Sequence, residues 1–220
     1  MSDKCYVGVL TYYRYLHFQL VLDEASKYLW GFLLHRKEES TAVALRHLQW
    51  LLAQGQHIKV FSSDQGRELL NAVMKTLFVL HGIEYIWTNA YSSEENVLVE
   101  KMNGIVMARD RCLLSATNMP MVLWGEAFRF VIDVLNIIAS TTLGGDTPYS
   151  RRLGLKPMWL RYARGAQKKS GKPELLVRYG EYSESCRIVN LPNGNVSEVH
   201  AVKVHKAWTA DGGYVRKLQS

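Results

Sequence analysis

Residues 58–68 read IKVFSSDQGRE, a short apolar run that leads into a polar turn containing an aspartate and a glycine. A run of this length bounded by turn residues is typical of a buried strand. The flanking segments, STAVALRHLQWLLAQG at 40–55 and LLNAVMKTLFVLHG at 69–82, space their apolar residues as helices do, and each ends in glycine. Helices on both sides of a buried strand predict a sheet with helical crossovers.

The same patterns extend in both directions along the chain. Aromatic, β-branched and aliphatic residues predict three strands before residue 40, with a turn at Asp23 to Ser26, and a further strand after the second helix. Helical spacing returns at 94–116 and at 120–140, where Pro120 suits a helix start. We therefore expect an α/β fold with a mixed sheet and flanking helices. The expected early strands are about 4–10, 14–22 and 27–35, and the later ones lie at 58–61 and 83–87.

The last third of the chain differs in charge from the rest. Residues 1–143 hold 13 Lys and Arg against 14 Asp and Glu, whereas residues 144–220 hold 14 against 6. We interpret 1–143 as the core domain, 144–173 as a basic linker and 174–220 as a small all-β segment with an Asn193-Gly194 hairpin turn. A basic tail beside an acid-bearing core indicates a polyanionic partner, although a solvated basic face is an equally simple reading.

The composition is that of a folded globular protein. Hydrophobic residues make up 48% and charged residues 21% of the 220 residues, and the formal net charge is +7. No apolar run approaches the roughly 20 residues that a membrane-spanning helix needs, and there is no secretory leader. Three widely spaced cysteines offer neither a disulfide framework nor a Cys-x-x-Cys zinc site, so we expect no zinc module and no secretion.

Two acids stand where a sheet-based active site would hold them. Asp64 ends the 58–64 strand, and catalytic groups in open α/β sheets gather at such carboxyl ends. Glu100 follows 35 residues later in the predicted 94–116 helix. A helical projection centred on an apolar stripe at Leu98 puts Glu100 on the opposite side, with Arg109 inside the stripe.

Seven segments together resemble the integrase core of copia-type LTR retrotransposons, relatives of retroviral integrases. Each is weak alone, but they follow one another in the same order as in that family and cover nearly the whole chain. The segments are LVLDEASKYLWGFLL, SSDQGREL, HGIEYI, YSSEENVLVEKMNG, NMPMVLWGEAFRFVIDVLN, DTPYSRRLGLKP and the tail LLVRYGEYSESCRIVNLPNGNVSEVHAVKV.

The resemblance implies a ribonuclease H-like fold and three catalytic carboxylates. Asp64 and Glu100 match the second and third acids of the family. Asp3 is our prediction for the first, and Asp23 is a competitor that better matches a turn acid. These carboxylates would hold two Mg²⁺ or Mn²⁺ ions, which stabilise the attacking and leaving oxygens in phosphoryl transfer.

The implied activity is metal-dependent processing and strand transfer of DNA ends, that is, DNA integration. The expected partners are double-stranded DNA, both element ends and target, and further copies of the chain in a homo-oligomer. We expect it to act in the nucleus and in a cytoplasmic particle. The residues predicted to contact DNA are Asn96, Lys101, Asn103, Arg111, Arg151, Arg152, Lys168 and Lys169.

Some positions depart from the family pattern. Lys101 and Gly104 stand where the family has arginine, and Val97 and Gln65 replace its glycine and asparagine. The guanidinium group of arginine can form two parallel hydrogen bonds to a phosphate, which the ammonium group of lysine cannot. An alternative is therefore a catalytically inactive nucleic-acid-binding remnant of a retrotransposon polyprotein. A ribonuclease or resolvase of the same fold is a third reading, which the resemblance of the tail disfavours.

Overall fold

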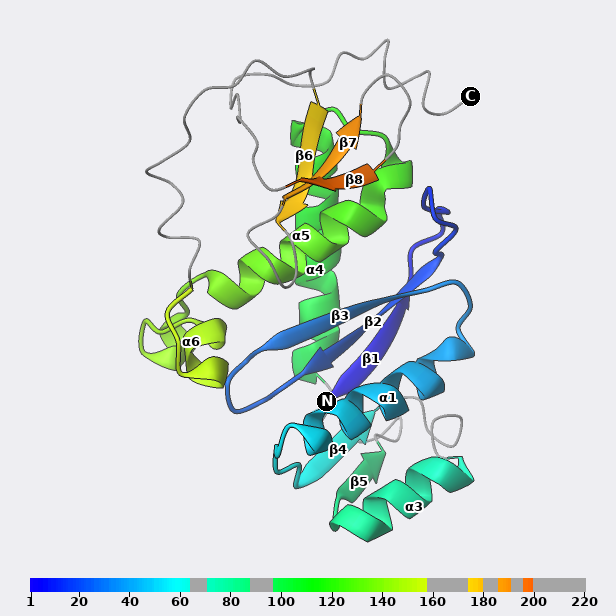
Figure 1. Cartoon of the computed structure of the whole chain (residues 1–220), viewed down its shortest axis with the longest axis vertical. Helices are drawn as coiled ribbons and strands as arrows, with labels where there is room; N and C mark the ends of the chain where they lie inside the picture. Colours follow the sequence, from blue (N-terminus) through cyan, green and yellow to red (C-terminus); the bar gives the residue numbers. More distant parts are fainter. Residues whose placement is uncertain (64–70, 88–96, 158–173, 180–185, 191–195, 200–220) are drawn as a thin grey trace. The chain divides into compact units, whose positions relative to one another are not determined.

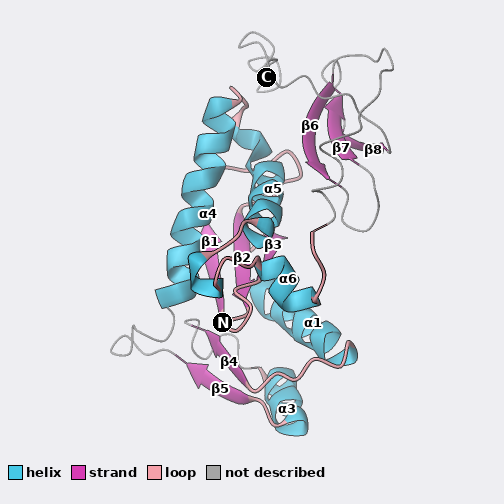
Figure 2. Cartoon of the chain, turned by 90° about the vertical axis from the view of Figure 1, so that its left-hand side faces the viewer, coloured by secondary structure: helices cyan, strands magenta, loops and turns pink. Residues whose placement is uncertain are grey.

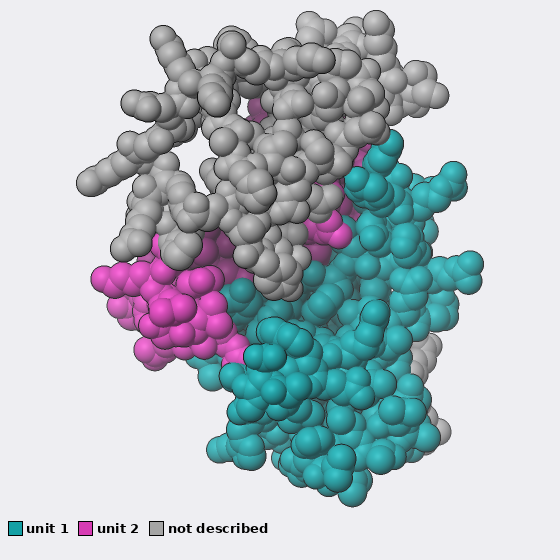
Figure 3. All heavy atoms as spheres, viewed as in Figure 1, with its two compact units in different colours: residues 1–106 teal, residues 107–220 magenta. Residues whose placement is uncertain are grey.

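The computed structural model describes residues 1–63, 71–87 and 97–157, together with three later strands, 174–179, 186–190 and 196–199. The chain forms two compact units, Met1–Val106 and Met107–Ser220 (Figure 3). The boundary between them falls inside one long helix. The domain limits predicted from composition, at 143 and 173, stay a prediction.

The first unit is built on a five-stranded mixed sheet in the order β3-β2-β1-β4-β5 (Figure 1). β1 pairs antiparallel with β2, which pairs antiparallel with β3, whereas β4 lies parallel to both β1 and β5. The predicted α/β class is thus confirmed, and β1 occupies the centre of the sheet. The strands are β1 Ser2–Tyr6, β2 His17–Leu22, β3 Leu29–Leu34, β4 Val60–Ser63 and β5 Glu84–Trp87.

The first two strands are shorter than predicted because the segment between them forms a loop. Gly8 has a φ of 83° and Arg14 a φ of 64°, conformations that a strand does not contain. The predicted turn at Asp23 to Ser26 is present between β2 and β3. The Asp23 carboxylate accepts hydrogen bonds from the Ser26 hydroxyl at 2.5 Å and the Ala25 amide at 3.3 Å. The Asp23 carboxylate therefore stabilises this turn.

Helix α1, Glu39–Ala53, and helix α3, Ala72–His81, pack beside the β4–β5 part of the sheet. Asn71 caps α3 by accepting from the Met74 amide at 2.8 Å, and Gly82 ends it in the left-handed conformation, as predicted. Local capping thus defines both ends of α3. The two helices and the sheet share a core of Ala44, Leu48, Phe61, Met74, Phe78 and Ile83.

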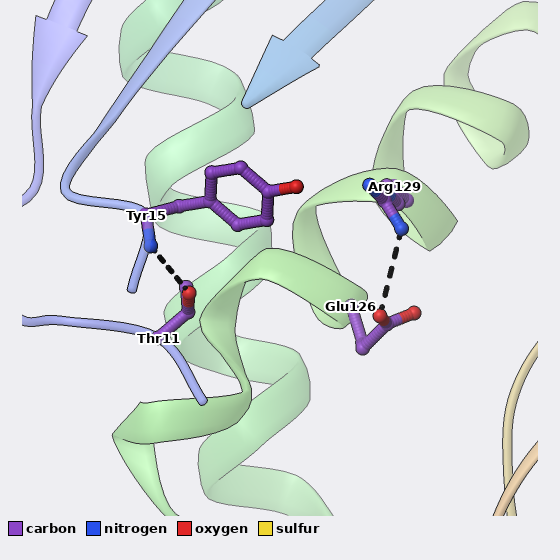
Figure 4. Close-up of polar contacts among 4 residues, drawn as sticks. All are labelled: Thr11, Tyr15, Glu126 and Arg129. Atoms are coloured by element: carbon purple, nitrogen blue, oxygen red, sulfur yellow. Dashed lines mark hydrogen bonds and ion pairs between the residues drawn. The ribbon is translucent and has the colours of Figure 1, made fainter. Parts of the chain in front are cut away.

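Helix α4, Val97–Ala116, contains the boundary between the units. It is followed by the 3₁₀ turn η2, Met121–Leu123, and by helix α5, Trp124–Ile137, so the helix predicted over 120–140 begins with one tighter turn. Trp124 is fully buried and meets Phe128 edge to face at 6.4 Å. Glu126 is buried in the first turn of α5 and forms an ion pair with Arg129 at 3.6 Å (Figure 4).

Part of the predicted basic linker is helical. After the 3₁₀ turn η3, Thr141–Leu143, helix α6 spans Pro148–Leu153. Thr147 accepts from the Ser150 amide at 3.0 Å and Gly154 ends the helix, so Thr-Pro and Gly were the capping signals that its basic composition obscured. The rest of the linker, 158–173, lies outside the described residues.

Three strands of the tail pair antiparallel in the order β6-β7-β8, namely β6 Glu174–Tyr179, β7 Cys186–Asn190 and β8 Val196–Val199. The Asn193-Gly194 turn predicted between the last two lies outside the described residues. Within the described part of the chain, no helix is long and apolar enough to cross a membrane.

Candidate active site

Asp3 lies in the central strand β1, on the face of the sheet that meets helix α4. Alternation along β1 and its register with β2 put Asp3 and Cys5 on one face with Leu20 and Phe18, and Ser2 and Lys4 on the other. Figures 1 and 2 show α4 on the first face and α1 on the opposite one. Only 6% of Asp3 is exposed, so its carboxylate depends on protein partners for its hydrogen bonds.

The two carboxylate oxygens of Asp3 have different partners. Oδ2 accepts a hydrogen bond from Nδ2 of Asn103 at 2.5 Å, across 100 residues of sequence. Oδ1 accepts from the backbone amide of Lys4 at 2.7 Å. The strand and the helix are therefore joined through the acid predicted to begin the triad.

Helix α4 buries a different face from the one predicted. Its buried stripe contains two polar side chains among apolar ones, and Leu98 and Arg109 are exposed. The prediction centred on Leu98 was wrong by one residue, or about 100° around the helix. The physical reason is that Asn103 turns inward to bond Asp3, which an apolarity pattern does not register. The buried residues are Val99, Asn103, Val106, Asp110 and Leu114.

Glu100 is exposed in the first turn of α4, as predicted from its position away from the core. It lies three residues before Asn103, and side chains at this spacing are neighbours on a helix surface. Asp64 lies outside the described residues. The last residue of β4 before it, Ser63, pairs with Ser2, next to Asp3 in β1. The structure thus brings Asp3 to the helix that carries Glu100 and leaves the second acid untested.

The residues predicted to contact DNA lie in several environments. Lys101 and Arg151 are exposed, Arg152 is half-buried, and Arg111 is exposed with its Nε donating to the Met107 carbonyl at 3.2 Å. Asn103 is buried at 8% exposure and is bonded to Asp3, so this geometry favours a supporting role rather than a DNA contact. The other three, Asn96, Lys168 and Lys169, lie outside the described residues.

One group in β1 and one in α4 have shifted acidities. Partial burial, with the charge of Asp3 adding to it, raises the pKa of the Cys5 thiol, so Cys5 stays protonated and is a poor nucleophile. Burial raises the pKa of Asp110 to about 7, and the nearby charge of Arg111 only partly opposes this effect. Only 3% of Asp110 is exposed, and no described residue donates a hydrogen bond to its Oδ1.

The groups around Asp3 fit a hard divalent cation. Besides the carboxylate, the Oδ1 atom of Asn103 is buried and accepts no hydrogen bond from the described residues. Carboxylate and amide oxygens are the ligands that Mg²⁺ and Mn²⁺ prefer. Within the described residues, no three His, Cys, Asp or Glu side chains come together as a complete metal site. A complete site would need Asp64, beyond those residues.

Three polyproteins of plant transposons are similar to the chain in sequence. No family model matches it. It is similar to the retrovirus-related Pol polyprotein from transposon RE1 of Arabidopsis thaliana, with 24% identity over 158 residues, 71% of this chain and 11% of that protein. The corresponding protein from transposon TNT 1-94 of Nicotiana tabacum is 26% identical over 133 residues, 60% of this chain and 10% of that protein. The Pol polyprotein from transposon RE2 of Arabidopsis thaliana is 22% identical over 211 residues, which are 89% of this chain and 14% of that protein.

One solved structure shows a similar fold. The chain is similar to one in the simian T-cell lymphotropic virus intasome in complex with PP2A regulatory subunit B56 gamma, with a TM-score of 0.53 and 17% identity over 80% of this chain and 60% of that chain. The HTLV-2 integrase catalytic core domain in complex with magnesium, in a trimeric form, gives a TM-score of 0.48 and 19% identity. The match covers 68% of this chain and 91% of that chain. The fold assignment rests on the first of these.

The mixed sheet with flanking helices is therefore similar in fold to the matched chain of that intasome. The homologues of the chain are retrovirus-related Pol polyproteins of copia-type transposons, and the resemblance predicted from sequence is confirmed. The chain spans only 10–14% of the length of these relatives.

Proposed function

We propose that this chain is the catalytic core of a retrotransposon integrase, a polynucleotidyl transferase that processes DNA ends and joins them to target DNA. The observation that carries the proposal is the bond between Asp3 and Asn103, because it holds the first predicted acid against the helix of the third. The similarity to transposon Pol polyproteins supports an integrase-like role.

In the proposed site, Asp3, Asp64 and Glu100 hold divalent metal, two ions in our prediction. When bound, such ions stabilise the attacking and leaving oxygens of an in-line displacement at phosphorus. Asp3 is held by Asn103 and the Lys4 amide in one orientation, so its carboxylate needs little reorganisation to accept a cation. Glu100, on the exposed side of α4, would approach from the side open to a DNA phosphate.

The proposed partners are double-stranded DNA and further copies of the chain. Lys101, Arg111, Arg151 and Arg152 would contact phosphates, with the basic tail adding affinity that falls as salt rises. The predicted basic linker and small β-rich segment would belong to this DNA-binding part. The proposed place of action is the nucleus, with a cytoplasmic particle before it.

Metal binding tests the site apart from activity. The melting temperature of the purified chain should rise with Mn²⁺ or Mg²⁺, because a ligand that binds only the folded state adds about 1.4 kcal/mol at roughly ten times its dissociation constant. Asp3→Asn and Glu100→Gln should each reduce the rise. Glu38→Gln, an exposed glutamate outside the site, is the matched control and should leave it unchanged.

Activity is measured with Mn²⁺ on a labelled duplex that ends in the terminal sequence of the element encoding the chain, and on supercoiled plasmid. End trimming or strand joining should appear in the wild type and disappear in Asp64→Asn and Glu100→Gln. A wild-type chain that binds metal but neither trims nor joins either DNA would contradict the proposed enzymatic activity.

One observation favours the alternative of an inactive DNA-binding remnant. A Cβ atom built at Gly104 would meet no atom of the described residues outside its own helix turn within 4 Å, so there is room at this position for the first atom of a side chain such as the family's arginine. The loss of that arginine is therefore a loss of DNA grip without a structural requirement. The remnant predicts salt-sensitive DNA binding that Asp3→Asn and Glu100→Gln leave intact, with no rise in melting temperature on adding Mn²⁺.

A further inference from the structure

The loop between β1 and β2, residues 7–16, carries a cluster of exposed aromatic and aliphatic side chains that the proposed active site does not use. We name residues 6–16 the tyrosine loop, because Tyr6 at the end of β1 adds to it. Tyr6, Tyr12 and Tyr13 are 62%, 53% and 40% exposed, and Val9 and Leu10 are exposed beside them. Exposed apolar side chains gathered on one segment indicate a binding surface more strongly than scattered ones do.

The exposure of these rings is built into the loop. Val7 donates to the Leu16 carbonyl at 3.1 Å, and Thr11 donates to the Tyr15 carbonyl at 3.0 Å. The Tyr15 amide in turn donates to the hydroxyl of Thr11, which is buried, at 2.8 Å (Figure 4). The backbone is therefore tied across the loop while the tyrosines between these ties face outward. A rigid display of rings lowers the entropy lost on binding.

Arg14 extends the loop in a backbone conformation that L residues rarely adopt, with a φ of 64°. Its amide donates to the Thr11 carbonyl at 2.9 Å, and its own carbonyl lies 3.2 Å from Nδ1 of His35. The ring of His35 stacks on Tyr15 with centroids 4.4 Å apart. These contacts fix the backbone of Arg14, whose side chain is exposed and which follows Tyr13 directly in the sequence. Residues in strained backbone conformations cluster at functional sites.

The charge around the tyrosine loop is positive. From Lys4 to Leu22 the chain contains no Asp or Glu. The exposed Arg36 and Lys37 follow His35 directly. The first acids after them are Glu38 and Glu39, and Glu39 is engaged with the His35 amide at 3.0 Å. A loop that presents exposed rings and an arginine and contains no acid of its own suits a flexible polyanion that offers flat bases, since a protein partner would need only the apolar contacts.

We propose that the tyrosine loop binds single-stranded nucleic acid, with Tyr6, Tyr12 and Tyr13 stacking on bases and Arg14 contacting the backbone phosphates. This site goes beyond the proposed catalytic function, because none of its side chains belongs to the predicted acids and binding would need no metal. Unpaired bases are required, since the faces of bases in a duplex are already stacked on one another.

The test compares two single strands of equal length and charge, oligothymidylate and the same backbone without bases, by fluorescence anisotropy in EDTA. The basic tail is expected to bind both strands through phosphates, so the ratio of the two dissociation constants isolates stacking. In the wild type, oligothymidylate should bind roughly tenfold or more tightly than the abasic strand. In the double variant Tyr12→Ala, Tyr13→Ala the ratio should fall toward one.

Matched variants separate stacking from folding and from charge. Tyr12→Phe with Tyr13→Phe keeps the rings and should keep the ratio. Arg14→Gln should weaken the binding of both strands by the same factor. Val79→Ser with Leu80→Ser removes exposed aliphatic surface on α3 and should change neither affinity.

Two results would overturn the proposal. One is a double alanine variant, shown to be folded by circular dichroism, that keeps the wild-type ratio. The other is a wild-type chain that binds oligothymidylate no more tightly than the abasic strand, but self-associates in sedimentation experiments. If the double alanine variant loses that self-association, the loop is a contact between copies of the chain. Asp3→Asn should keep the ratio whatever its nuclease activity, so the catalytic proposal and this one fail separately.

Discussion

The side chain of Asn103 in α4 donates to the carboxylate of Asp3 in β1 at 2.5 Å, although the two residues are 100 positions apart. Both are buried, so neither can exchange this bond for one to bulk water at no cost. The predicted third acid, Glu100, lies one helical turn away on α4. The bond therefore sets the rotation of α4 as well as the orientation of Asp3.

Asn103→Ala should destabilise the first unit by about 1–3 kcal/mol, because it leaves a buried carboxylate short of one charge-assisted hydrogen bond. Urea unfolding measures the change. In an Asp3→Ala background the same substitution should cost clearly less, because the partner is already gone. Equal costs in both backgrounds would show that Asn103 contributes by packing alone.

Asp110→Asn should stabilise the chain at pH 8 and have a much smaller effect at pH 5. Burial raises the pKa of Asp110 to about 7, whereas the ordinary value is 3.8. Between these pH values the folded state holds a proton that the unfolded state has lost, so stability falls as pH rises from about 4 to about 7. The penalty above that range is up to about 4 kcal/mol, which the neutral amide avoids. The urea unfolding midpoints of the wild type and the Asp110→Asn variant at both pH values measure the change in stability, and Glu38→Gln is the control. A gain of the same size at both would refute the ionisation argument.

Gly104→Arg should strengthen binding to duplex DNA and also stabilise α4. A Cβ atom at this exposed helical position meets no atom of the described residues outside its own helix turn within 4 Å, and replacing a mid-helix glycine gains up to about 1 kcal/mol. One added phosphate contact should steepen the salt dependence of binding by about one unit. Gly104→Ala is the matched control and should gain the stability without the DNA affinity. A Gly104→Arg chain that binds DNA no better than Gly104→Ala would place this face of α4 away from DNA.

Asn71→Ala should lower the stability of the first unit by about 1 kcal/mol, because the Asn71 side chain accepts from the Met74 amide at 2.8 Å at the start of α3. Asn71→Asp should retain most of the stability, since a carboxylate also caps and suits the positive end of the helix. Thermal unfolding compares the two. If the aspartate variant melts with the alanine variant, the cap is not what holds this helix end.

Much of the fold was predictable because its signals are local. The αL stop at Gly82, the turn acid Asp23 and the strand IEYIW each depend on a few neighbouring residues. Helix α6 was missed for the opposite reason, since its Thr147 and Gly154 caps stand in a basic segment that was read by composition. The loop at residues 7–16 was taken for strand ends because Tyr and Val favour strands, whereas the left-handed conformation of Arg14 is not visible in residue type.

The sequence by itself determined the chain order of most strands and helices, several of the caps that end them, the resemblance to transposon integrases and the choice of candidate acids. The tertiary structure alone decided which face of α4 is buried. Apolar spacing pointed to a stripe at Leu98, but the buried face contains Asn103 and Asp110. A buried amide is stable only where a partner meets it, and the partner of Asn103 is supplied by a strand 100 residues earlier, beyond the reach of any local pattern.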